Sequence, residues 1–538
     1  MKAAKPLFRF VIIGSLFAIL TIGVGPVRGV WKIGIMRDGQ LCSNCPWPKF
    51  QYNNRNTGFG PFAGPGDSNL KFVGQYRYVG GGGCRAVNDN WIYGHPAIGA
   101  DGTIYYGTFG DQTTRSHKKE AKLYALEDCA GKPGCEDNVL RLKWAYPKLN
   151  MQHNDPAGEL CSIEFTTPTI TEDGVIYVGT DCGLYALKDM GDHAEKLWSF
   201  NASSYGHPVP PVGEEAQVNT SPAIGADGTI YFAVCFLSVT IDEDLFYGQF
   251  FALNPDGTMK WDAPFETDSW ITASPAIGAD GTVYFASTGD GQFTNPEGPK
   301  LFALRDLGNR YELKWTFAAD ARISFAPVID DRGVIYFGST AKNFAAQPGK
   351  LYALEDCYGQ PDCPDGWKHH WKEPYTYTLI NNDGVMEEEE KGWCLAASVS
   401  IGPDGTVYAP ILKAGKPSQG QLFQTVDPVD GKILGITEQD GGPALSYRYD
   451  LSEPVMFASP VIDAGGNVYL SSGHPGSPGH FWAFSHDLKE FSRLETEHVV
   501  ATSPAIGANG HIYFGTSYPE FKNTDYDPIF YAVGPRAE

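Results

Sequence analysis

One phrase recurs along the chain and limits what the chain can fold into. It reads TSPAIGADGTIYF from Thr220 and returns almost unchanged from Ala273 and Thr502. Looser copies begin at His95, Thr166, Phe325, Ala397 and Ala458. In each copy an apolar run meets a short turn with Gly, and a run of Val, Ile, Tyr or Phe follows. Gly adopts the positive φ of a hairpin turn, and β-branched and aromatic residues suit strands. Each copy therefore predicts a β-hairpin.

A second pair of short runs follows most copies, for example QFFALNPDGTMKW from Gln249 and KLYALEDC from Lys350. The repeating unit is therefore four strands, which we name A to D. The Pro of each phrase serves as a marker, and Val399 takes its place in the sixth copy. Successive markers are 44 to 72 residues apart. Four-stranded units at such spacing are typical of a β-propeller. The sequence thus predicts an all-β fold, an eight-bladed β-propeller with four-stranded antiparallel blades.

The N-terminal part of the chain is expected to complete the ring. The last repeat ends with FYAVGP from Phe530 and has no strand D, while the residues from Asn69 to Phe72 read like the D strands elsewhere. A strand over 69–78 would pair beside Phe530 and close the eighth blade, which removes open sheet edges. We expect a signal peptide or anchor over 1–29, an N-terminal segment over 30–68, the propeller over 69–534 and a tail over 535–538.

The first residues indicate export. Lys2, Lys5 and Arg9 precede an apolar run that ends near Gly25, which is short for a membrane span and suits a signal peptide. Cleavage after Gly29 and retention as an uncleaved anchor both remain open, and membrane contact is expected only in the second case. We expect a periplasmic or extracellular protein. The formal net charge of −22 argues against nucleic acid as a partner.

Eleven cysteines in an exported chain indicate disulfides. Two pairs recur at the same place between strands C and D, namely Cys129 with Cys135 and Cys357 with Cys363. Cys161 and Cys182 are expected at the same face of the second blade and form a third candidate pair. Cys42 and Cys45 suit a local disulfide or partners elsewhere. The sequence does not assign Cys84, Cys235 or Cys394.

The chain resembles the PQQ-like repeat propellers, a family that includes quinoprotein alcohol dehydrogenases and a non-catalytic lipoprotein of the bacterial outer-membrane assembly machinery. The resemblance rests on the SPAIGADGTIYFGT, LYAL, NPDGT and KW elements and on the WP…RNTG…GP opening, and it covers residues 47 to 534. It implies the fold. It does not decide function, because members with and without a quinone share these elements.

Departures from the enzymes of this family bear on cofactors. The dehydrogenases carry two adjacent cysteines over the quinone, and this chain has no Cys-Cys dipeptide. The haem-bearing relatives add a CxxCH segment, which is also missing from the sequence. The Asp of the ADG turns suits hairpin chemistry better than a Ca²⁺ site. We expect no cofactor and no metal, with PQQ and Ca²⁺ as the alternative.

Loop lengths indicate the functional face. The connections from B to C and from D to A are long in many blades, among them residues 236–248, 413–420 and 373–395. Both kinds of connection emerge on one face, and binding residues gather on loops held by a rigid frame. The position five residues before the marker holds Trp91, Trp270 and Arg322, and Glu164 and Asn219 lie just ahead of strand A. These five are candidate ligand-binding residues for a flat ring, although side chains that fill the channel mouth and satisfy one another are the favoured interpretation of so few residues.

Two classes of function fit this sequence. The first is a non-catalytic propeller that binds an envelope or surface protein, or a polymer, through the loop-rich face. The second is a PQQ-dependent oxidoreductase acting on alcohols or sugars. The missing Cys-Cys pair favours the first, and the sequence places no catalytic residue.

Overall fold

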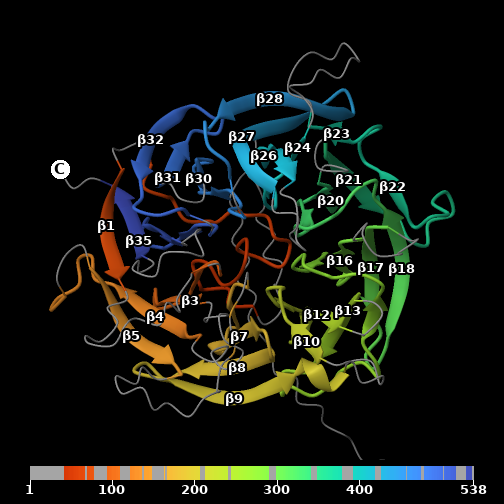
Figure 1. Cartoon of the computed structure of the whole chain (residues 1–538), viewed down its shortest axis with the longest axis horizontal. Coiled ribbons are helices and arrows are strands. Elements are labelled where there is room, and N and C mark those ends of the chain that lie inside the picture. The colour runs from red at the N-terminus through yellow and green to blue at the C-terminus, as the bar shows by residue number, and fades with distance from the viewer. Residues whose placement is uncertain are drawn as a thin grey trace, which may run out of the picture. The chain divides into compact units, whose positions relative to one another are not determined.

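Eight antiparallel sheets surround a common centre, as the sequence predicts (Figure 1). We obtained the structure as a computed structural model, and all described elements belong to the unit that runs from Arg37 to Glu538. The structure describes residues 41–66, 70–77, 92, 94–108, 121–135, 139–147, 161, 163, 166–205, 213–239, 244–289, 298–340, 348–377, 392–417, 426–455, 457–473, 478–500, 502–516 and 529–535. No helix within these ranges is long and apolar enough to cross a membrane.

The first four blades follow the chain order. Blade 1 has β2 (Ala97–Ile98), β3 (Ile104–Gly107), β4 (Leu123–Asp128) and β5 (Leu140–Tyr146). Blade 2 has β6 (Thr169–Ile170), β7 (Val175–Thr180), β8 (Gly183–Asp189) and β9 (Ala194–Asn201), followed by a 3-10 turn, η1 (Ala202–Tyr205). Blade 3 has β10 (Gly213–Gln217), β11 (Ala223–Ile224), β12 (Ile230–Val239), β13 (Asp244–Leu253) and β14 (Phe265–Thr267). Blade 4 has β15 (Ala276–Ile277), β16 (Val283–Ser287), β17 (Lys300–Asp306) and β18 (Tyr311–Ala318).

The other four blades complete the circle. Blade 5 has β19 (Val328–Ile329), β20 (Val334–Gly338), β21 (Lys350–Asp356), β22 (Trp367–His369) and β23 (Tyr375–Thr376). Blade 6 has β24 (Trp393–Leu395), β25 (Ser400–Ile401), β26 (Val407–Pro417), β27 (Val426–Gln439) and β28 (Gly442–Asp450). Blade 7 has β29 (Val461–Ile462), β30 (Val468–Gly473), β31 (Gly479–Phe484) and β32 (Glu490–Glu495). Blade 8 has β33 (Ala505–Ile506), β34 (Ile512–Gly515), β35 (Ile529–Pro535) and the N-terminal β1 (Leu70–Arg77).

Strand β1 closes the ring as predicted. It pairs antiparallel with β35, from Leu70 opposite Pro535 to Arg77 opposite Ile529. The two ends of the propeller sequence thus share one sheet, which covers the edge that β35 would otherwise expose. Aromatic stacks join blade 8 to its neighbours, with ring centroids of Tyr106 and Phe530 4.4 Å apart.

The Ser of the SPAIG phrase joins neighbouring blades around the channel. The residue before the marker donates its backbone N–H to the hydroxyl at the same position one blade on. Four such bonds are Thr167 to Ser221 (2.8 Å), Ser221 to Ser274 (2.9 Å), Ala326 to Ser398 (3.0 Å) and Ser459 to Ser503 (2.8 Å). The repeated Ser therefore has a structural role, because each hydroxyl satisfies a buried N–H of another sheet.

An aspartate at the end of strand C joins blades farther from the axis. Asp306 of blade 4 accepts hydrogen bonds from the Tyr231 hydroxyl (2.6 Å) and the Trp261 indole (3.2 Å) of blade 3. Asp189 of blade 2 accepts the equivalent bonds from Tyr105 and Trp144 of blade 1. The LYAL and KW elements of the repeat therefore supply both partners of a junction between sheets.

The described residues contain four disulfides. Cys129 bonds Cys135, Cys357 bonds Cys363 and Cys161 bonds Cys182, which confirms the three predicted pairs. Cys42 and Cys45 form the local disulfide that was one of two alternatives. Cys235 and Cys394 are buried in strands β12 and β24, and Cys84 lies outside the described residues. These disulfides are consistent with an exported protein.

Candidate functional site

Residues 41–66, called the closing segment below, seal the channel at the face that carries the A to B turns. The segment exchanges backbone hydrogen bonds with the last residue of strand A in six blades, and the Asn54 side chain bonds that residue in blade 3. These residues are Ile98, Ile170, Ile224, Ile277, Ile329, Ile401 and Ile462. Figure 1 shows the segment as a red trace inside the ring of sheets. The segment therefore bonds the inner strands of seven blades at this face.

A buried lysine organises the closing segment. Lys49 is fully buried, and its ammonium group donates to Asn56 Oδ1 (2.6 Å) and to the carbonyls of Phe50 and Asn53 (3.2 Å each). A buried ammonium group is stable only when its donors are hydrogen-bonded. These bonds fold residues 49–56 around the lysine.

Two asparagine amides connect the closing segment to the blades. The amide of Asn54 donates to the carbonyl of Ile224 (2.7 Å) and accepts its N–H (3.3 Å), as a strand would. The Asn56 amide donates to the carbonyls of Pro275 (3.2 Å) and Pro327 (3.1 Å) in adjacent blades. The RNTG motif is thus used to satisfy backbone groups at the centre of the ring.

Gly58 of this motif has no room for a side chain. Its φ is +67°, and a Cβ atom there would lie 2.3 Å from Ser400 Oγ and 3.1 Å from the carbonyl oxygen of Pro460. Only Gly adopts this conformation at so close an approach without strain. The close approach lets the segment bond both blade 6 and blade 7.

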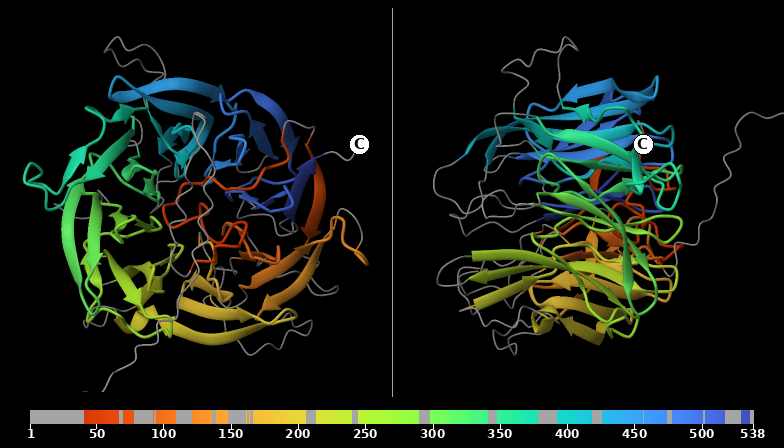
Figure 2. Two further views of the ribbon diagram at one scale, coloured as in Figure 1. Left: turned by 180° about the vertical axis from the view of Figure 1, so that it is seen from behind. Right: turned by 90° about the vertical axis from the view of Figure 1, so that its right-hand side faces the viewer.

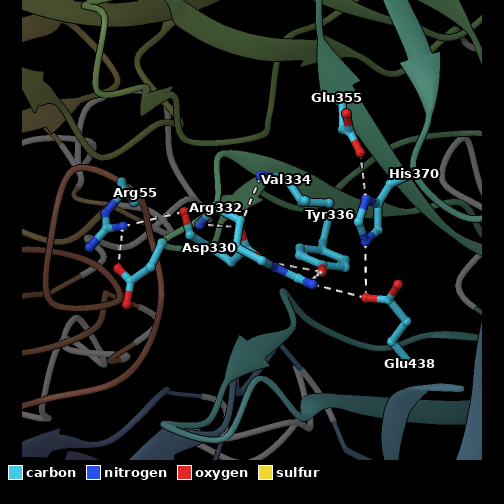
Figure 3. A network of polar contacts seen from close by, with 9 residues as sticks. Arg55, Asp330, Arg332, Val334, Tyr336, Glu355, His370 and Glu438 are labelled. Atoms are coloured by element: carbon cyan, nitrogen blue, oxygen red, sulfur yellow. Dashed lines mark hydrogen bonds and ion pairs between the residues drawn. The ribbon is translucent and has the colours of Figure 1, made fainter. Parts of the chain in front are cut away.

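Charged residues extend the contact outward through blades 5 and 6 (Figure 3). Arg55 of the closing segment pairs with Asp331 (2.6 Å). In the same turn, Arg332 pairs with Asp330 (2.8 Å) and with Glu438 of blade 6 (2.9 Å). The closing segment is thereby linked to the blade 5 turn, and that turn to blade 6.

His370 continues this network between two carboxylates. Its Nδ1 lies 2.7 Å from Glu355 Oε1 and its Nε2 lies 3.1 Å from Glu438 Oε2. Hydrogen bonds from Arg332 and then His370 lower the pKa of Glu438, and the bond from His370 lowers the pKa of Glu355. Both carboxylates therefore stay ionised at neutral pH. The network belongs to the face of the A to B and C to D turns, which we call the plain face.

The loop-rich face is built differently from the expectation in two blades. Residues 236–239 and 244–248 continue strands β12 and β13, and 413–417 continue β26, so parts of the expected loops are extended hairpins. The cause is an added inner strand, because β10 pairs with the end of β12 and β24 with the end of β26. In the side view of Figure 2 these long strands project at the face opposite the closing segment. Most of the other long connections lie outside the described residues.

Three of the five predicted binding residues are described. Trp270 and Arg322 are half-buried at equivalent places, because the carbonyl of each accepts an N–H from the end of strand B, from Thr288 and Thr340 respectively (2.8 Å each). The Trp270 indole donates to the carbonyl of Phe236 in blade 3 (2.9 Å). The Asn219 amide donates to Gln217 Oε1 (3.3 Å). Trp91 and Glu164 lie outside the described residues. A ligand-binding role for these five residues stays a prediction.

Phe457 is a residue of this face that sequence reasoning missed. It lies three residues before the marker of blade 7, the position that Asn219 holds in blade 3. It is 42% exposed and has a φ of +58°. A left-handed aromatic residue is uncommon and is maintained only by its surroundings. The sequence shows that Phe457 stands three residues before a marker, but it does not predict the left-handed backbone conformation.

The described residues do not fit the ion that accompanies the quinone in the resembled enzymes. Ca²⁺ needs several oxygen ligands, usually with carboxylates among them. In the described ranges, no three His, Cys, Asp or Glu side chains are grouped so that they could hold a metal ion.

Comparisons with known proteins agree with the fold. No family model and no curated protein sequence matches the chain. Among solved structures, the quinohemoprotein alcohol dehydrogenase ADHIIG of Pseudomonas putida HK5 superposes with a TM-score of 0.58 at 14% identity, over 92% of this chain and 81% of that one. The chain therefore shares the propeller fold of that protein.

Two other solved structures align more loosely with this propeller. A gluconolactonase of Xanthomonas campestris has a TM-score of 0.27 at 13% identity, over 62% of this chain and 93% of that one. A chain of the mitotic checkpoint complex has a TM-score of 0.33 at 8% identity, over 68% of this chain and 87% of that one. Neither alignment is close enough to inform function. At these identities the comparisons establish the architecture alone.

Proposed function

We propose that this protein is an exported, non-catalytic propeller that binds an envelope or surface protein, or a polymer, through its loop-rich face. The observation that carries the proposal is the closing segment, which bonds seven blades at the plain face. With that end of the channel sealed, recognition is left to the opposite face. The site would lie in the periplasm or outside the cell.

The shape of the loop-rich face also supports a large ligand. Strands β12 and β13 of blade 3 and β26 and β27 of blade 6 extend beyond the frame of the ring (Figure 2). Strands β10 and β24 are the innermost strands of these two blades, so the extensions border the channel mouth. Extended hairpins offer a broad and rigid contact surface, which suits a protein or polymer better than a small molecule.

The second candidate is a PQQ-dependent oxidoreductase acting on alcohols or sugars. The fold shared with the Pseudomonas putida dehydrogenase is the observation in its favour. Such an enzyme needs a dense polar cluster that holds the quinone and a carboxylate base beside the substrate. The candidates Trp270, Arg322 and Asn219 do not supply that carboxylate.

A loop replacement tests the first proposal. We would exchange residues 378–391, between β23 and β24, for a short Gly-Ser linker and capture partners from an envelope extract. The proposal predicts that the intact chain retains a defined protein or polymer and that the exchanged chain loses it. Asp192→Ala serves as a matched control, since its side chain is 91% exposed in a turn of the plain face. Equal capture by the exchanged chain, or loss with the control alone, would contradict the proposal.

A further inference from the structure

At least three blades, within the described residues, join the D to A connection to their own B to C hairpin at one repeated position. Seven residues before the marker, blade 2 has Cys161, blade 5 has Asp320 and blade 7 has Glu453. In blade 2 the tie is the disulfide from Cys161 to Cys182, which lies in the turn between β7 and β8. The same two elements are therefore joined covalently in this blade.

In blade 5 the tie consists of polar contacts. Asp320 Oδ2 pairs with the Lys350 ammonium group (2.7 Å), and Oδ1 accepts from the Tyr352 hydroxyl (2.5 Å) and from Ser339 Oγ (3.1 Å). Ser339 lies at the end of strand B, and Lys350 and Tyr352 at the start of strand C. Burial raises the pKa of Asp320, but the hydrogen bonds from Lys350 and Tyr352 outweigh burial and lower it. The carboxylate is thus ionised and occupied on both oxygens.

Blade 7 repeats this arrangement with other residues. Glu453 Oε1 accepts a hydrogen bond from Ser472 Oγ and lies 2.9 Å from His480 Nδ1. Ser472 and Ser339 are each twelve residues after their markers. His480 stands opposite Ser472 across β30 and β31, as Lys350 stands opposite Ser339. The Trp482 indole donates to Ser472 Oγ (2.5 Å). Glu453, Ser472 and His480 of blade 7 therefore correspond in position to Asp320, Ser339 and Lys350 of blade 5.

The chemistry changes from blade to blade while the two joined elements stay the same. A disulfide, a carboxylate with an ammonium group and a carboxylate with an imidazole share no ligand or reaction. We infer that these three contacts, called clasps below, fix the position of the residues that follow them at the channel mouth. In blade 5 that chain includes Arg322, and in blade 7 it includes Phe457. Asp320 and Glu453 are then positioning residues and do not themselves contact the ligand.

The backbone around Phe457 supports this role. The N–H of Gly473 donates to the carbonyl of Pro454 (2.9 Å), next to the clasp, so the connection is fixed at its start. Phe457, three residues farther on, is exposed and has a left-handed φ, which is unfavourable for an aromatic residue unless neighbours hold it. A clasp that fixes the preceding residues supplies that constraint. The inference rests on the proposed function only in assigning a ligand to this face.

Hydrogen exchange in the free protein tests the clasps without any ligand. Glu453→Ala should speed exchange of residues 454–459 by at least about tenfold through local opening, and leave residues 321–326 unchanged. Asp320→Ala should do the reverse, so each variant is the control of the other. Glu438→Ala, which removes a carboxylate of the plain face, should alter neither stretch. If Glu453→Ala does not fold, Ser472→Ala and His480→Gln each remove one arm and are measured at the same amides.

Two results would overturn the clasps. One is unchanged exchange at residues 454–459 in Glu453→Ala. The other is faster exchange through the whole chain, which would make Glu453 a general stabilising residue. Hydrogen exchange is measured in the free protein, so it tests the clasps without a ligand. The capture experiment tests the proposed binding separately, and the two can therefore fail independently.

Discussion

The backbone N–H of Ser503 donates a hydrogen bond of 2.7 Å to Nδ1 of His95, across 408 positions of sequence. This bond joins blade 8 to blade 1 at the place where other neighbouring blades use a serine hydroxyl. The imidazole packs at a tilt of 30° against the ring of Phe50 in the closing segment, with ring centroids 5.1 Å apart. One side chain therefore connects the last blade, the first blade and the closing segment.

His95 should make stability fall in acid. Burial lowers its pKa from 6.5 to about 3, so the unfolded chain takes up a proton between these values and the folded chain does not. The free energy of unfolding should therefore decrease as the pH falls from 6.5 toward 3, by about 1.4 kcal/mol per unit from this group. His95→Ser keeps an acceptor and should remove that contribution to the slope. Denaturant unfolding at several pH values measures it, and equal slopes in both proteins would contradict it.

Replacing Gly58 should destabilise the protein for a steric reason. In Gly58→Ala the new Cβ meets Ser400 Oγ at 2.3 Å, so the closing segment or blade 6 must move. Gly66 is the matched control, because its φ is +71° and nothing lies within 4 Å of its added Cβ. We expect Gly58→Ala to lower the free energy of unfolding by about 1–3 kcal/mol more than Gly66→Ala. Equal effects in denaturant unfolding would show that the close approach does not constrain the segment.

The disulfide of blade 2 should stabilise the protein through its loop. Cys161 and Cys182 are 21 residues apart, and closing a loop of about this length is worth roughly 3 kcal/mol in the chain-entropy model. Replacing both by Ser should lower the free energy of unfolding by about that amount. Peptide mapping without reduction should show all four disulfides of the wild type. Free thiols at Cys161 and Cys182 in exported protein would contradict the pairing.

Much of the fold could be predicted because its determinants are local and repeated. The Gly turns of eight phrases and the missing D strand after Phe530 sufficed for the blade number and for the pairing of β1 with β35. The recurrence of Cys129 and Cys357 at one place in the repeat likewise predicted their disulfides.

The closing segment and the clasps could not be predicted in this way. The Asn54 and Asn56 amides bond groups that are far away in sequence, and no local pattern reports such partners. Asp320 and Glu453 share a position in the repeat, but their partners differ in type, so alignment of the phrases alone does not reveal a common role. The extension of β12 depends on pairing with β10, which is a tertiary contact.

We propose that this propeller binds a partner and is not a quinone-dependent dehydrogenase. The most direct measurement is to incubate the purified, disulfide-bonded protein with PQQ and Ca²⁺, remove unbound quinone by gel filtration, and record the absorbance and the dye-linked oxidation of alcohols and sugars. We predict that no quinone absorbance stays with the protein and that no dye is reduced. Stoichiometric retention of PQQ with substrate-dependent dye reduction, abolished by Arg322→Ala in a folded protein, would contradict the account.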